Sequence, residues 1–224
     1  MKITLPKIIL VATLFTFIGG GVYLNLQEKA SIDNSKIPQK LEEERGFQRW
    51  ITNAKNKDIL VEADEFRLLE ENEIYNTRWM QVYSLDEPGR KEEFEANLEA
   101  HKNVDHVIFS PSDRIFLDYR NMARDRYAPN EVHLYGQKED KILDARVLEC
   151  VNGNNCYFDR AYFLDNDVFV VHEVSLADPA NLCKPDETCA YTFKVHLVDL
   201  INNKRWIYES EEKPMEFTWA KREL

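Results

Sequence analysis

Apolar and polar positions follow each other in a repeated order between residues 104 and 210. Residues 107–119, VIFSPSDRIFLDY, and residues 161–173, AYFLDNDVFVVHE, each hold an apolar run, a short polar break and a second apolar run. This order is typical of a β-hairpin. A second strand, turn and strand pattern follows each one, in EVHLYGQKEDKIL from Glu131 and KVHLVDLINNKRWI from Lys194. The offset is 54 positions for the first pair and 63 for the second, so the pattern predicts two copies of a four-stranded antiparallel unit.

The predicted fold class is mainly β (α+β), with these two units as its centre. We expect strands at 106–110, 114–120, 131–136 and 142–149 in the first copy, and at 160–164, 168–176, 190–199 and 204–209 in the second. Both faces of 168–176 are largely apolar, which predicts a strand buried on two sides. The repeats and their C-terminal edge define a predicted β region at 104–218.

Residues 40–103 predict a mixture of helices and strands that belongs to the same domain. KLEEERGFQRWITNAKNK carries apolar residues at helical spacing, with acidic residues early and lysines late, which suits a helix dipole. Residues 58–75 fit a strand followed by a strand or short helix, and the alternation in NTRWMQVYSL, residues 76–85, predicts a further strand. Segment 58–87 could therefore supply extra strands to the β region. Phe94 and Leu98 lie one turn apart and predict a second short helix.

A long apolar run near the N-terminus indicates export. Lys2 and Lys7 precede an almost uninterrupted apolar stretch from Ile8 to Leu26, long enough to cross the hydrocarbon core. Basic residues on its N-terminal side favour a cytoplasmic N-terminus. We therefore expect a single-pass anchor at 1–26 in the inner or plasma membrane, a polar linker at 27–39 and an extracytoplasmic (periplasmic) domain. A cleaved signal peptide is the main alternative, and a cytoplasmic protein is a further one.

Four cysteines support the same compartment. They form two C-x5-C pairs, Cys150 with Cys156 and Cys183 with Cys189. An even number of cysteines in an exported chain predicts disulfides. Local pairing is the expected connectivity of the three that four cysteines allow. Zinc binding and redox activity usually use the shorter C-x2-C spacing.

Charge and motifs limit the function classes. The formal net charge is −11, from 29 basic and 40 acidic residues, and such a surface repels nucleic acid. The sequence contains no metalloprotease, nucleophile-elbow or phosphate-loop motif. No cofactor is expected, and an enzymatic role is disfavoured. His133 and His196 occupy matching places in the two repeats, which favours a structural role over a shared site.

Two loops are candidates for partner binding. Residues 121–130, NMARDRYAPN, connect the hairpins of the first copy, and an insertion at 177–189 lies at the matching place in the second. Loops on a rigid scaffold often carry binding residues. The candidate residues are Arg120, Arg124, Arg126, Tyr127, Lys184 and Asp186. A solvated loop with surface ion pairs is the alternative for the arginine cluster.

The first hairpin carries a family resemblance. SPSDRIFLDY resembles the S-P-D-G-R-x-hydrophobic stretch of β-propeller blades of the TolB and WD40-like kind, and KVHLVDLINNKRWIY is similar to the strand, Asp, turn, Lys, strand order that follows it. Asp113 stands near the family's acidic turn position, but Arg114 follows where the family has glycine. The resemblance implies blade-like architecture only. Two units cannot close a propeller, which needs at least about four blades.

Together these features favour a membrane-anchored, exported binding or assembly module that contacts the membrane and a protein partner. Two alternatives remain open. One is an extracytoplasmic hydrolase whose carboxylates come from distant parts of the chain. The other is a structural subunit of an envelope complex.

Overall fold

The computed structural model describes residues 35, 37–56, 59, 61–74, 80–123, 128–150, 156–178, 180, 183 and 187–216. All helices and strands below belong to one unit, residues 36–224. The predicted anchor at 1–26 lies outside the described residues. Within the described ranges, no helix combines the length and apolar character needed to cross a membrane.

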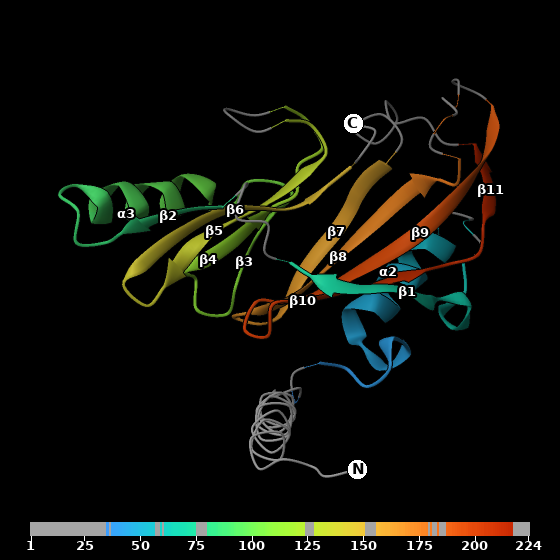
Figure 1. Cartoon of the computed structure of the whole chain (residues 1–224). Helices are drawn as coiled ribbons and strands as arrows, with labels where there is room; N and C mark the ends of the chain where they lie inside the picture. The colour runs from blue at the N-terminus through green and yellow to red at the C-terminus, as the bar shows by residue number, and fades with distance from the viewer. Residues whose placement is uncertain are drawn as a thin grey trace, which may run out of the picture. The chain divides into compact units, whose positions relative to one another are not determined.

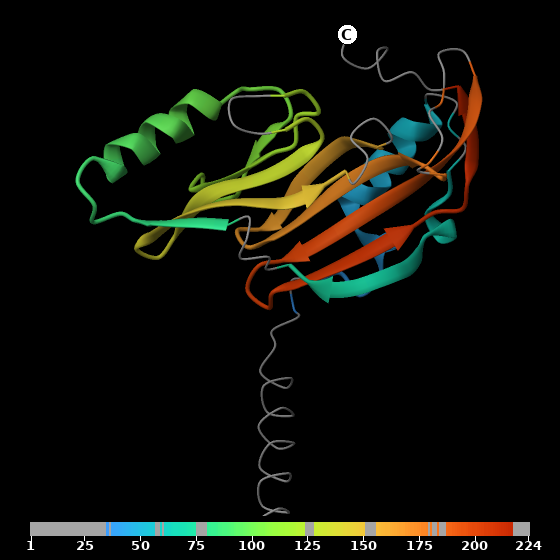
Figure 2. The same ribbon diagram turned by 45° about the horizontal axis from the view of Figure 1, so that its top comes forward.

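The protein is mainly β, as predicted, and its strands form two antiparallel sheets (Figure 1). Sheet A contains, in spatial order, β1 (Arg67–Glu73), β10 (Lys204–Glu209), β9 (Thr188–Asp199), β8 (Val168–Leu176) and β7 (Cys156–Asp165), with β11 (Lys213–Glu216) also paired to β9. Sheet B contains β2 (Met80–Ser84), β6 (Lys141–Glu149), β5 (Glu131–Lys138), β4 (Ile115–Asp118) and β3 (Val107–Phe109). Figure 2 shows β1, β10, β9 and β8 side by side.

All eight strands predicted for the two repeats are present, four in each sheet and in the predicted order. The sheets are nevertheless larger than four strands. Segment 58–87 supplies β1, which pairs with β10, and β2, which pairs with β6. The short strand β11 was not predicted. Each repeat is therefore a four-stranded meander extended at its last strand by a strand from earlier in the chain.

In the described part of the chain, two α-helices cover the sheets from outside. A 3-10 turn, η1 (Leu41–Glu43), leads into α2 (Arg45–Lys55), and η2 (Ala63–Glu65) follows it. The Glu44 side chain caps α2 by accepting a 2.7 Å hydrogen bond from the Phe47 amide. The helix α3 (Arg90–His101) buries Phe94 and Leu98, which confirms the predicted contact face.

The described elements form four layers in the order α3, sheet B, sheet A and α2, and a hydrophobic cluster fills the space between each two neighbouring layers. The first cluster joins α2 to sheet A, the second joins the two sheets, and the third joins α3 to sheet B. Figure 1 shows α3 and α2 at different sheets. All nine residues of β8 are buried because it has α2 on one face and sheet B on the other, and this confirms the two-sided burial predicted from its sequence.

Equivalent faces of the two repeats contact each other. Ile115 and Leu117 of β4 lie in the cluster between the sheets, and so do Phe169 and Val171 of β8. These pairs are related by the 54-residue offset of the repeats. The two strand patterns thus pack against each other through matching faces of β4 and β8.

Gly46 has a packing reason to be in the first turn of α2. A Cβ atom built there would come 2.4 Å from the ring of Tyr162 on β7. The Tyr162 hydroxyl donates a hydrogen bond to the Glu44 carboxylate, so the same ring also holds the helix cap. Glycine therefore lets α2 approach sheet A closely, which offsets its poor helix propensity.

Candidate functional site

A cavity of about 420 Å³ opens on the face of sheet A that turns toward sheet B, next to the cluster between the sheets. Residues of β1, β8, β9 and β10, the end of β6 and the start of β7 line it. They are Leu69, Glu70, Glu149, Cys150, Cys156, Glu173, Ser175, Leu176, Ala177, Thr192, Lys194, His196, Arg205, Ile207 and Glu209. Its size falls within the range of small-molecule sites.

Strand register places a row of alternating charges across the floor of this cavity. Lys194 on β9 lies opposite Glu209 on β10 and opposite Glu173 on β8. Its Nζ lies 3.7 Å from Glu209 Oε1 and 3.6 Å from Glu173 Oε1. One lysine thus bridges two carboxylates from neighbouring strands.

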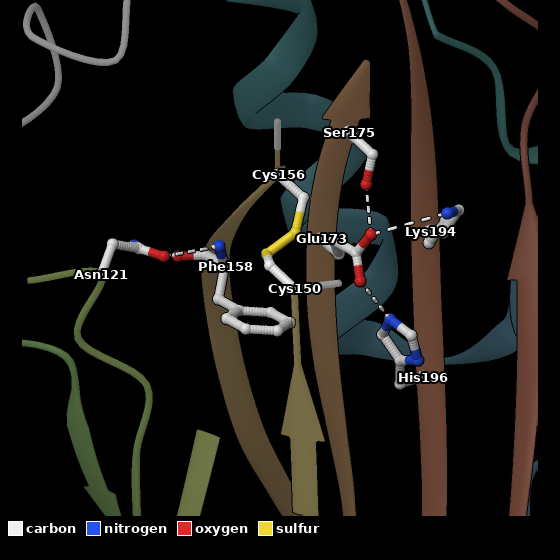
Figure 3. The surroundings of a disulfide bond; sticks show 8 residues. All are labelled: Asn121, Cys150, Cys156, Phe158, Glu173, Ser175, Lys194 and His196. Carbon is white, nitrogen blue, oxygen red and sulfur yellow. Dashed lines mark hydrogen bonds and ion pairs between the residues drawn. A yellow bond between two sulfur atoms is a disulfide. The ribbon is translucent and has the colours of Figure 1, made fainter. Parts of the chain in front are cut away.

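Glu173 is the centre of a buried hydrogen-bond network (Figure 3). Its Oε2 lies 2.8 Å from His196 Nε2, and its Oε1 accepts a hydrogen bond from the Ser175 hydroxyl. Glu173 is 7% exposed and His196 is 5% exposed. Because an ionised carboxylate can only accept, this contact places a proton on His196 Nε2.

The network holds Glu173 in its charged form. Burial by itself would raise the pKa of Glu173. The hydrogen bond and charge of His196, the charge of Lys194 and the hydrogen bond of Ser175 outweigh burial and lower the pKa to about 2. The carboxylate is therefore ionised at every physiological pH.

Arg205 is a second cation in the cavity, and unlike Lys194 it contacts a neutral amide rather than a carboxylate. Its Nε donates a 3.0 Å hydrogen bond to the Asn72 side-chain oxygen. Burial lowers the pKa of Arg205, while the charges of Glu70 and Glu173 raise it. Among the described residues it forms no ion pair with any carboxylate. The guanidinium therefore keeps hydrogen-bonding capacity toward the cavity.

The arrangement of Ser175, Glu173 and His196 differs from a nucleophilic triad. In a triad the base contacts the nucleophile and the acid lies behind the base. Here the carboxylate lies between the other two groups, and the Ser175 hydroxyl donates to it. The network can orient groups and hold charge, but it gives Ser175 no contact with a base.

The matching histidine of the first repeat forms its own pair. His133 Nε2 lies 2.8 Å from Glu131 Oε2, and Arg146 bonds the other oxygen of Glu131 at 2.7 Å. The two matching histidines therefore contact different carboxylates, one in each sheet. The structural role expected for both histidines stays a prediction.

Both predicted disulfides are formed by local pairing. Cys150 is joined to Cys156, and Cys183 is joined to Cys189, with Cα–Cα distances of 5.8 and 6.1 Å. The first links the end of β6 to the start of β7 and so ties sheet B to sheet A. It also lines the cavity beside Glu173 (Figure 3).

The predicted partner-binding residues are placed only in part. Arg120 forms an ion pair at 2.6 Å with the buried carboxylate of Asp118, and 22% of its side chain is exposed. Arg124, Arg126, Tyr127, Lys184 and Asp186 lie outside the described residues. Partner binding by the two loops stays a prediction. Among the described residues, no group of three or more His, Cys, Asp or Glu side chains is arranged to hold a metal ion.

Sequence reasoning missed the charged residues of the cavity. Glu173 and Ser175 interrupt the apolar face of β8, and Lys194 and His196 interrupt the matching face of β9. Polar residues at alternate positions of buried strands were the available signal. The pairing of strands that brings them into one row could not be inferred from that signal alone.

No protein-family model, no curated protein and no solved structure matches this chain.

Proposed function

We propose that the chain is an exported binding module that holds a ligand, either a small molecule or a segment of a protein partner, in the cavity of sheet A. The observation that carries the proposal is the cavity itself, which combines an ordered charged network with an arginine that forms no ion pair among the described residues. Sites of this kind pair an apolar wall with a few placed polar groups.

Export to the extracytoplasmic (periplasmic) side of the inner or plasma membrane, with residues 1–26 as the anchor, belongs to the same proposal. The disulfides support an oxidising compartment. The resemblance of each four-stranded meander to a propeller blade also stays a prediction. The strand, polar turn, strand order of both repeats supports it.

The hydrolase alternative receives less support. A pair of carboxylates with raised pKa values in one pocket would favour acid–base hydrolysis. In this cavity the pKa of Glu173 is lowered to about 2, which removes it as a proton donor near neutral pH. Ser175 contacts that carboxylate rather than a base. Binding is therefore the function that the geometry supports best.

A cavity-blocking variant tests the proposal. The full-length protein is purified in mild detergent, incubated with extract from the compartment outside the membrane, and analysed by native mass spectrometry. The variant Ala177→Trp adds an indole at the cavity wall, and Ala100→Trp on the exposed face of α3 is the matched control. We expect a bound mass on the wild type and the control that Ala177→Trp loses. A bound mass unaffected by Ala177→Trp, or none on any protein, would count against the proposal.

A further inference from the structure

Arg205 differs from the other charged groups of the cavity in its partners. Burying a guanidinium costs free energy unless a hydrogen-bonded anion accompanies it. Arg205 is half-buried, yet among the described residues only its Nε is hydrogen-bonded, to the neutral amide of Asn72. The guanidinium stays protonated under all ordinary conditions. An anion placed against its terminal amino groups would complete the site.

The carboxylates that line the cavity are already engaged elsewhere. Glu173 contacts His196, Ser175 and Lys194, Glu209 contacts Lys194, Glu149 lies 2.6 Å from Arg146, and Glu70 accepts a 2.6 Å hydrogen bond from Asn72. Each of these carboxylates therefore already has a partner of its own. Within the part of the chain that the structure describes, the carboxylates lining the cavity thus have other partners, which leaves Arg205 able to receive the anion of a ligand.

The neighbours of Arg205 describe the rest of such a ligand. Ile207 lies two residues along β10 on the same face, and Leu69 and Leu176 add apolar wall. The surrounding carboxylates disfavour a dianion such as phosphate, because like charges would repel it. A group with one negative charge and two oxygens in a plane, such as a carboxylate, matches the bidentate donor geometry of one guanidinium.

We propose that the cavity binds a carboxylate attached to an aliphatic group, with the carboxylate on Arg205 and the aliphatic part on Ile207. This inference rests on the proposed function, since it assumes that the cavity is the ligand site. Two sources supply the same chemistry. One is a free aliphatic carboxylic acid, and the other is the C-terminal residue of a peptide.

Titration calorimetry on the full-length protein tests the inference with defined probes. The probes are isocaproate, its amide, an N-acetylated tripeptide ending in leucine with a free carboxylate, the same peptide amidated, and inorganic phosphate. We expect at least one acid to bind at least about tenfold more tightly than its amide, because the amide lacks the charge-assisted pair. The acid that binds identifies the source.

Two substitutions locate the binding group. Arg205→Gln should weaken binding of the acid at least about tenfold, whereas Arg205→Lys, which keeps the charge but loses the two-pronged geometry, should fall between. Arg90→Gln on α3 is the matched control, since Arg90 lies outside the cavity lining. Far- and near-ultraviolet circular dichroism shows whether each variant is folded. If Arg205→Gln fails to fold, the Arg205→Lys comparison and the acid–amide difference still decide the outcome.

Several results would overturn the inference. They are binding of phosphate alone, equal binding of acids and amides, no binding of any acid, and acid binding that Arg205→Gln leaves unchanged. A bound mass that Ala177→Trp removes, together with no acid binding, would leave the cavity as the ligand site and reject only its carboxylate chemistry. Absence of both would reject the proposed function as well.

Discussion

Acidification from pH 7 to pH 5 is expected to destabilise this fold through one side chain, His172 on β8. The imidazole is 0% exposed and packs under α2, with its ring centroid 4.0 Å from that of Trp50 and 5.5 Å from that of Tyr162. Neither ring nitrogen has a hydrogen-bond partner among the described residues. Burial, then the positive charge of Arg160, then His196 lower its pKa well below 6.5.

Proton linkage sets the direction in which His172 makes the stability of the fold depend on pH. The folded state keeps His172 neutral, whereas the unfolded chain binds a proton as the pH falls below about 6.5. Stability from this residue is therefore present above that pH and is lost below it. If the folded imidazole stays neutral to pH 5, the loss between pH 7 and pH 5 is about 2 kcal/mol, or roughly 4 to 8 °C in Tm for a domain of this size.

Other charged groups around the ring do not change this direction. Glu44 at the cap of α2 is held by the Tyr162 hydroxyl, and Asp159 on β7 accepts a 2.8 Å hydrogen bond from Trp50 Nε1. Both carboxylates thus have partners of their own. The imidazolium would gain a charge inside an aromatic cage without a bonded counter-ion.

Urea denaturation at half-unit pH steps, followed by tryptophan fluorescence, measures the effect. His172→Phe keeps an aromatic ring against Trp50 and cannot be protonated, so its stability should fall about 2 kcal/mol less than that of the wild type between pH 7 and pH 5. His101→Phe is the matched control, because His101 also stacks on an aromatic ring, that of Phe116 at 4.5 Å, but is only half-buried. Parallel pH curves for the wild type and His172→Phe would refute the reasoning.

Three further predictions concern the site and its supports. Glu173→Gln should lower the free energy of unfolding by about 3 kcal/mol at pH 7, because it breaks a buried charged network. The variant should also lack the stability that the wild type loses as the pH falls from 4.5 toward 2. Chemical denaturation at pH 7 and pH 3 measures both effects, and an equal difference between variant and wild type at the two pH values would contradict the linkage. Gly46→Ala should destabilise by about 1 to 3 kcal/mol despite better helix propensity, because the new methyl group meets the Tyr162 ring; thermal melting that shows a gain would contradict the close approach. Replacing Cys150 and Cys156 together by serine should cost about 2 kcal/mol through loss of a short crosslink; unchanged melting and an unchanged response to reductant would contradict it.

The central strands could be predicted from the sequence because they are buried. The strand β8 has an apolar residue at almost every position, and the two repeats reinforce each other. The edge strand β1, RLLEENE, gave a weaker signal because six of its seven residues are exposed. Its position depends on pairing with β10, including the ion pair between Glu71 and Lys204. Such long-range pairing has no local pattern.

The candidate site could be predicted less well than the fold. The cysteine spacing gave the correct disulfides because each pair closes a short polar turn. The charged row needed more information. Lys194, Glu173 and Glu209 meet only because three strands pair in one particular register, and a one-residue shift would turn a strand's side chains to the other face.

A sequence difference between the two matching segments accompanies the cavity network on sheet A. The offset of 63 aligns His133 with His196 and Glu131 with Lys194. In the first copy the histidine takes its carboxylate from Glu131, two residues away on its own strand. Lysine occupies that place in the second copy, so the carboxylate comes from Glu173 on the neighbouring strand. With a lysine at this place, the carboxylate beside the histidine lies on β8 and the lysine contacts Glu209 on β10, so the local pair of sheet B corresponds to a network across three strands in sheet A.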